Sequence, residues 1–137
     1  MSFEPKKYHE GKILSLAMGA SATLTKGSHC KMTSGYLAAG AAGDNEAEYI
    51  AMETKTSSSV AGADFCLVLP CDDAIEWEAA TDIDIVVATH VGIDVDFKTA
   101  ASLELGATTD KVFHIDSAKA PLTGRIVRGH FNKPALA

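Results

Sequence analysis

The segment HVGIDVDF, residues 90–97, decides the fold class of this 137-residue chain. Its apolar side chains occupy every second position and alternate with polar side chains or glycine, as Val91, Ile93, Val95 and Phe97 against His90, Gly92, Asp94 and Asp96. Successive side chains of a β-strand point to opposite faces of the sheet, so this pattern is typical of a strand with one buried and one solvated face.

Further strand candidates lie on both sides of this segment, with turn residues between them: KILSLAM (12–18), ATLT (22–25), EAEYIAMETK (46–55), IEWEA (75–79), DKVFHID (110–116) and GRIVRGHF (124–131). SHCKMTS (28–34) leads into Gly35 and then Tyr36 and Leu37, which predicts a hairpin. DFCLVLP (64–70) is a continuous apolar run, which predicts a strand covered on both faces.

Helix signals are weak by comparison. No segment longer than about ten residues combines a 3.6-residue apolar period with caps at both ends, although a short helix is compatible with 38–52 or 98–104. The sequence therefore predicts an all-β fold, or a mainly β fold with one short helix, built as a compact β-sandwich or barrel. Its length suits one domain, at 12–131, between an extended N-terminal arm (1–11) and a C-terminal tail (132–137).

Charge is distributed unevenly along the chain. Residues 44–110 hold fifteen acidic and two basic residues, a net charge of −13, whereas residues 1–43 carry +3 and residues 111–137 carry +4. Such blocks govern solubility and the choice of partners rather than the fold. We interpret the acidic middle as a solvated surface and the basic ends as the part that faces a partner.

The sequence contains none of the common catalytic or nucleotide-binding motifs: GxSxG, GxxxxGK[ST], GxGxxG after a strand, or HExxH. Its cysteines, Cys30, Cys66 and Cys71, lack the two close ligand pairs of a structural zinc site and do not indicate a disulfide framework. We therefore expect a protein that is not an enzyme and that uses no cofactor and no metal.

Paired acidic residues are the strongest alternative to that expectation. Asp94 and Asp96 project to the same face of the expected strand, where two carboxylates could share a divalent cation. The further ligands, turn glycine and closing glutamate of a calcium loop are missing around them. A solvated strand face is the interpretation that we favour.

Nucleic acid and membranes are not expected as partners. Twelve basic residues stand against eighteen acidic ones, so a phosphate backbone would be repelled. The longest run without a charged residue, 13–25, has 13 residues, whereas a membrane-spanning helix needs about 18.

The order of features resembles the head decoration, or capsid cement, proteins of tailed bacteriophages. The likeness spans most of the chain and rests on MSFEPKKYHEG at the N-terminus, the small-residue turns GASATLTKG and SGYLAAGAAGDNE, the strand VGIDVDF, and the late segments LELGATTDKVFHID and GRIVRGHFNKP. The resemblance implies a structural virion protein, commonly a homotrimer, that binds the major capsid protein on the outer surface of an icosahedral capsid and stabilises it. It also implies synthesis in the cytoplasm of a bacterial host.

Under that resemblance, the chain ends and one indole would supply contacts with the capsid or with other subunits: Phe3, Pro5, Lys6, Lys7, Tyr8, Trp77, Arg125, Arg128, Phe131, Lys133 and Pro134. Trp77 also suits the inward face of its strand, where it would be the largest core residue. Two other functions stay open: another phage structural component, such as a head fibre, tail or joining protein, and a small β-barrel module that binds a ligand.

Overall fold

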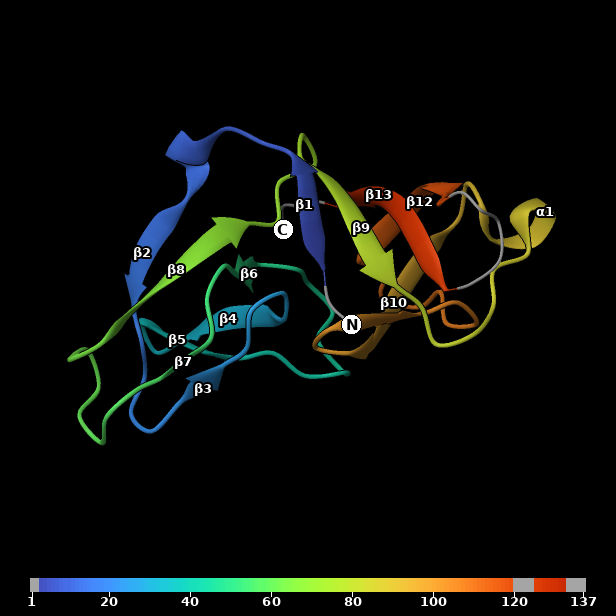
Figure 1. The fold of residues 1–137 in the computed structure, drawn as a ribbon. Helices are drawn as coiled ribbons and strands as arrows, with labels where there is room; N and C mark the ends of the chain where they lie inside the picture. Colours follow the sequence, from blue (N-terminus) through green and yellow to red (C-terminus); the bar gives the residue numbers. More distant parts are fainter. Residues whose placement is uncertain (1–2, 120–124, 133–137) are drawn as a thin grey trace.

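The computed structural model describes residues 3–119 and 125–132, and most of its regular structure is antiparallel strand (Figure 1). The strands are β1 (Glu4–Lys7), β2 (Leu14–Ala17), β3 (Thr23–Leu24), β4 (His29–Thr33), β5 (Tyr36–Ala39), β6 (Tyr49–Ala51), β7 (Lys55–Thr56), β8 (Phe65–Pro70), β9 (Glu76–Ala80), β10 (Asp94–Thr99), β11 (Ser102–Glu104), β12 (Phe113–Ala118) and β13 (Ile126–Phe131). A 3-10 turn, η1 (Glu10–Lys12), and a short helix, α1 (Val87–His90), complete the elements. The predicted mainly β fold is confirmed.

A six-stranded sheet in the order β1-β9-β13-β12-β10-β11 forms the larger half of the molecule. It curls until Thr81, just after β9, bridges Leu103 on β11. Apolar side chains fill its inner side, with five aromatic residues at the centre: Phe3, Trp77, Phe97, Phe113 and Phe131. Each of these rings is at most 2% exposed, so this cluster is the main core.

A five-stranded sheet in the order β2-β8-β6-β4-β5 forms the other half. It also curls, because Met18 after β2 bridges Leu37 on β5 and thereby brings the two edge strands together. We call this sheet the small barrel. Its interior is a second core of buried residues, namely Met18, Leu24, Cys30, Leu37, Ala51, Cys66 and Val68. The predicted hairpin is confirmed as β4–β5, with positive φ at Ser34 and Gly35 in its two-residue turn.

The two halves share one packed interface. Ile50 and Leu69, on the outer face of the small barrel, belong to the main core beside Phe97. His29 on β4 stacks on the ring of Phe97, and the His29 amide donates to the carbonyl oxygen of Ala100 at 2.6 Å. The halves therefore form one domain.

Three sequence predictions need correction. The strand expected at 90–97 begins only at Asp94, because His90 ends α1 and Gly92, with φ +88°, makes a turn. The segment 98–104 forms strand and turn, and 38–52 forms strands and a loop, so the one helix of the described residues lies at neither position. The strand at 64–70 is not covered on both faces, because Phe65 and Leu67 are exposed.

The expected N-terminal arm is part of the domain over its described residues. Residues 4–7 form β1, which pairs with β9 at the edge of the six-stranded sheet, and Phe3 is buried in the main core. Extended backbone was predicted correctly, but its partner is a strand of the same chain. In the part of the chain that the structure describes, no helix is long and apolar enough to cross a membrane.

Candidate functional site

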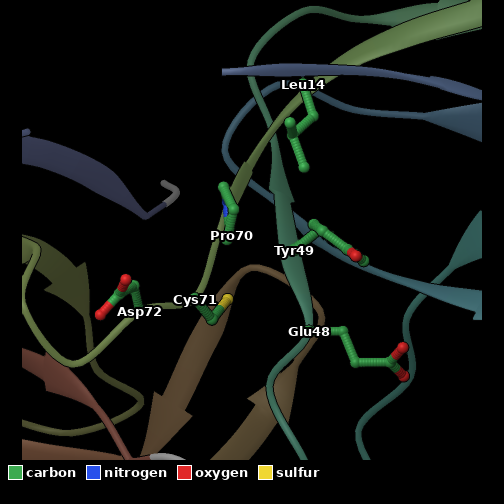
Figure 2. A pocket seen from close by; sticks show the side chains of 6 residues that line it. All are labelled: Leu14, Glu48, Tyr49, Pro70, Cys71 and Asp72. Carbon is green, nitrogen blue, oxygen red and sulfur yellow. The ribbon is translucent and has the colours of Figure 1, made fainter. Parts of the chain in front are cut away.

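The open end of the small barrel holds a pocket of about 330 Å³ (Figure 2). It is lined by Leu14, Glu48, Tyr49, Pro70, Cys71 and Asp72. In Figure 2 the carboxylates of Glu48 and Asp72 lie on opposite sides of Cys71, while Leu14 and Tyr49 extend from neighbouring parts of the barrel wall. This barrel-mouth pocket combines apolar walls with two acidic groups.

Strand ends create the pocket. Tyr49 begins β6 and pairs with Pro70, which ends β8, while Leu14 begins β2 and pairs with Val68. Paired residues project to the same face of a sheet, so Leu14, Tyr49 and Pro70 extend the apolar interior of the barrel to its open end. Beyond Pro70 the Cys71 amide donates one further hydrogen bond, to the carbonyl oxygen of Glu48 at 2.9 Å, and this contact places both residues at the pocket.

The two acidic groups have different surroundings. Asp72 accepts a hydrogen bond from Lys12 at 2.7 Å and one from the Ala74 amide, and these hydrogen bonds lower the pKa of Asp72 to about 2. One oxygen of Glu48 accepts a long hydrogen bond of 3.3 Å from the Met32 amide. Among the described residues, Lys12 is the one basic side chain paired with either carboxylate, so the described rim of the pocket is net acidic.

The surroundings of the Cys71 thiol in the pocket do not favour a nucleophilic thiolate. Burial raises the pKa of Cys71 well above its ordinary value of 9.0, and the neighbouring Cys30 and Glu48 raise it further. Catalytic cysteines need the opposite, a thiolate stabilised by nearby positive charge. Across residues 3–119 and 125–132, no group of three His, Cys, Asp or Glu side chains is placed to hold a metal ion.

The acidic pair singled out in the sequence does not form a joint site. Asp96 is only 7% exposed, and its carboxylate accepts hydrogen bonds from the amides of Thr109, Asp110 and Lys111. Asp94 instead contacts His114 at 2.9 Å and Asn132 at 2.9 Å. The predicted solvated face is therefore wrong for Asp96, which organises the loop before β12.

Three of the expected interface anchors lie inside the chain. Phe3, Trp77 and Phe131 are each at most 2% exposed and contact one another in the main core. Their assignment as contacts with a partner is wrong in this conformation, and the core interpretation of Trp77 is confirmed. Phe3 and Phe131 were expected to contact a partner because they lie near the chain ends. The sequence does not show that β1 and β13 pair with β9, and this pairing buries both rings.

The basic ends of the chain meet its acidic middle at Glu78. This residue on β9 is 5% exposed, and its Oε2 lies 3.0 Å from both Nε and Nη2 of Arg128. Lys119 and Lys6 approach its Oε1 at 3.3 and 3.5 Å. Burial by itself raises the pKa of Glu78, but the hydrogen bonds from Arg128 and Lys119 and the charge of Lys6 outweigh it and hold the pKa below 4.5.

Other basic residues of the chain ends also pair with the middle: Lys7 with Glu76, Lys12 with Asp72, and Arg125 with Asp84. The interpretation of the acidic middle as a purely solvated surface is therefore wrong for Glu78. Lys7 and Arg125 remain substantially exposed, as does Tyr8, while Pro5 is half-buried, so a partner contact at these residues stays a prediction. Lys133 and Pro134 lie outside the described residues.

Two exposed apolar surfaces were not found from the sequence. The first, which we call the β8 patch, consists of Phe65 and Leu67, which are 49% and 42% exposed. The second, the α1 patch, consists of Ile83, Val86 and Val87, which are 45–54% exposed. Figure 1 places the start of β8 and α1 at opposite ends of the molecule. Apolar residues in a sequence do not reveal which of them the fold leaves uncovered.

The segment that carries the α1 patch contacts Arg125 at its start and is closed by a local hydrogen bond to His90. Arg125 donates to the Asp84 carboxylate at 3.0 Å and to the carbonyl oxygen of Asp82 at 3.1 Å. The Val86 amide donates to Nδ1 of the buried His90 at 2.9 Å. These contacts define the conformation in which the two valines are exposed.

Comparisons of this chain with protein-family models, with curated proteins and with solved structures found no match.

Proposed function

We propose that this chain is a structural protein that binds the outer surface of an icosahedral phage capsid and stabilises it. The observation that carries the proposal is the presence of two exposed apolar surfaces, the β8 patch and the α1 patch, at opposite ends of the molecule. Exposed apolar clusters on a small protein mark interaction sites. A protein with one such surface at each end can hold two neighbouring molecules together.

The remaining features agree with a mechanical role. The thiols are buried, Asp94 and Asp96 are hydrogen-bonded within the chain, and no metal cluster occurs among residues 3–119 and 125–132. The resemblance of the sequence to capsid decoration proteins supplies the identity of the partner, the major capsid protein. Because the capsid lattice repeats the same site many times, many weak contacts would together hold the protein on the capsid strongly. We expect the protein to be a homotrimer in solution.

The direct test is co-sedimentation of the purified chain with expanded capsids, and separately with precursor shells, of the phage that carries its gene. We expect binding to expanded capsids alone, and an increase in the temperature at which those capsids open in a calorimeter. Val86→Ser should weaken the binding at least about fivefold, since it removes apolar area from the contact. Failure to bind expanded capsids, or binding without any gain in capsid stability, contradicts the proposal.

A matched variant controls for general effects of lost surface hydrophobicity. Val60 is 62% exposed and lies outside both patches, so Val60→Ser should leave capsid binding unchanged. Light scattering on the free protein should give three times the mass of the 14.3 kDa chain. Equal losses for Val60→Ser and Val86→Ser would show that the α1 patch is not the contact surface.

The barrel-mouth pocket favours the second candidate, a small ligand-binding module. Its volume of about 330 Å³ falls at the lower end of the range of about 300–1,000 Å³ that is usual for small-molecule sites. Saturation with a true ligand at about 100 times its dissociation constant would raise the free energy of unfolding by about 2.7 kcal/mol. Such a shift with a free metabolite would favour this alternative.

A further inference from the structure

We propose that the barrel-mouth pocket binds an arginine side chain of a partner protein. The identity of that partner as the capsid subunit rests on the proposed function, whereas the choice of arginine rests on the pocket itself. Three properties of the pocket lead to arginine: its net charge, the arrangement of its apolar walls, and the carboxylate at its rim.

The charge of the rim favours a cation. Asp72, like an ordinary carboxylate, is ionised at neutral pH, and Lys12 at 2.7 Å compensates one negative charge. The carboxylate of Glu48 accepts a hydrogen bond from the Met32 amide at 3.3 Å. Among the described residues, no basic side chain donates to it. A carboxylate has two oxygens and about four acceptor positions, so Glu48 keeps capacity for further donors.

The walls favour a cation with a long apolar stem. Leu14 is 38% exposed at the mouth, and Pro70 lies beside it at the end of β8, so both offer apolar surface to a methylene chain. The half-buried ring of Tyr49 stands across the strand pair from Pro70. A cation over a tyrosine ring gains from the negative face of the ring, and a flat guanidinium can also stack on it.

Arginine fits this combination better than lysine does. Its planar fork can donate two parallel hydrogen bonds to a carboxylate, whereas an ammonium group acts as a point charge. The thiol of Cys71 in the same pocket is neutral, since burial raises its pKa well above 9.0, so the negative charge of the pocket comes from its carboxylates. A partner that presents arginine would therefore place its guanidinium between Glu48 and Tyr49 and its stem against Leu14 and Pro70.

The first experiment uses a soluble probe on the isolated protein. N-acetyl-arginine amide is titrated into the ¹⁵N-labelled chain, with N-acetyl-lysine amide and N-acetyl-norleucine amide as comparisons. We expect saturable shifts of the Glu48, Tyr49, Cys71 and Asp72 amides with the arginine probe, weaker shifts with lysine and none with norleucine. Equal shifts with all three probes, or no saturable shift with arginine, would overturn the assignment.

Variants locate the binding within the pocket. Glu48→Gln should weaken binding of the arginine probe at least about fivefold, because it removes the charge and one acceptor of the fork. Tyr49→Phe keeps the ring and should retain binding, as expected if the ring face rather than the hydroxyl contacts the guanidinium. Glu46→Gln is the matched control, since Glu46 is exposed, lies two residues away and does not line the pocket. Equal binding by the Glu48 and Glu46 variants would refute the role of Glu48.

Capsid binding then separates this inference from the proposed function. We expect Glu48→Gln to bind expanded capsids at least about fivefold more weakly than Glu46→Gln does. If both variants bind capsids as the wild type does, the pocket inference fails and the proposed function stands. If no variant binds capsids but the arginine probe still occupies the pocket, the proposed function fails and the arginine site stands.

Discussion

The imidazole of His29 lies nearly parallel to the ring of Phe97, with 4.7 Å between the ring centroids and 16° between the planes. His29 belongs to the small barrel and Phe97 to the six-stranded sheet, so this contact joins the two halves of the domain. Nε2 of His29 accepts the Glu48 amide at 3.0 Å, which requires that nitrogen to be unprotonated. The packing of the two sheets therefore depends on a neutral histidine.

Acid should destabilise the protein through His29. Burial lowers its pKa to about 4, although the nearby Asp44 carboxylate opposes the shift. The unfolded chain, with an ordinary pKa near 6.5, binds the proton more tightly, so stability is complete above about pH 6.5 and falls as the pH approaches 4. We expect a loss of about 3 kcal/mol in the free energy of unfolding over this window, measured by urea titration.

His29→Gln provides the comparison for this pH dependence. Glutamine can accept the Glu48 amide through its oxygen but does not titrate. The variant should be less stable than the wild type at pH 7 and should lose clearly less stability between pH 6.5 and 4.5. The same pH dependence in both proteins would show that another group is responsible.

Gly40 should not tolerate a side chain. A Cβ at this position would lie 2.5 Å from His29 Nδ1 and 2.6 Å from the His29 carbonyl oxygen, so the backbone of β4 would have to move. We expect Gly40→Ala to lower the free energy of unfolding by about 1–3 kcal/mol. Gly43→Ala is the control, because nothing lies within 4 Å of a Cβ there, and its effect should stay within about 0.5 kcal/mol.

Loss of the charge on Glu78 should be costly. Glu78→Gln would leave Lys6, Lys119 and Arg128 close together without the carboxylate that holds them. We expect a decrease of about 1–3 kcal/mol in the free energy of unfolding at pH 7. Glu76→Gln removes the same charge from the same strand, but its partner Lys7 is 82% exposed, so the change should be at most about 0.5 kcal/mol. Similar losses for the two variants would contradict this account.

The three cysteines should be unreactive in the folded protein. Burial raises the pKa of Cys30 to about 12 and also raises those of Cys66 and Cys71, so little thiolate is present at neutral pH. A thiol reagent at pH 7.5 should label none of them rapidly in the native state, and all three in urea. Rapid labelling of a single cysteine in the native protein would show that its surroundings open.

Local patterns in the sequence predicted more of the secondary structure than of the candidate site. Alternation around Val95 and Phe97 predicted a strand, and Gly35 predicted the hairpin, because both depend on residues adjacent in the chain, whereas the burial of Asp96 between them was not predicted. The exposure of Phe65 and Leu67 was predicted incorrectly, since an apolar run cannot show where the opposing sheet ends. The barrel-mouth pocket could not be predicted, because its residues come from the ends of β2, β6 and β8.

The sequence by itself determined that this protein is built from short antiparallel strands, because the period of the side chains and the turn residues act within a few positions. Only the tertiary structure decided how the charges are used. It placed Lys6 from one end of the chain and Lys119 and Arg128 from the other around the buried Glu78. The physical reason is the strand order. Because β9 lies between β1 and β13, the two basic chain ends flank an acidic strand whose carboxylates form ion pairs with them.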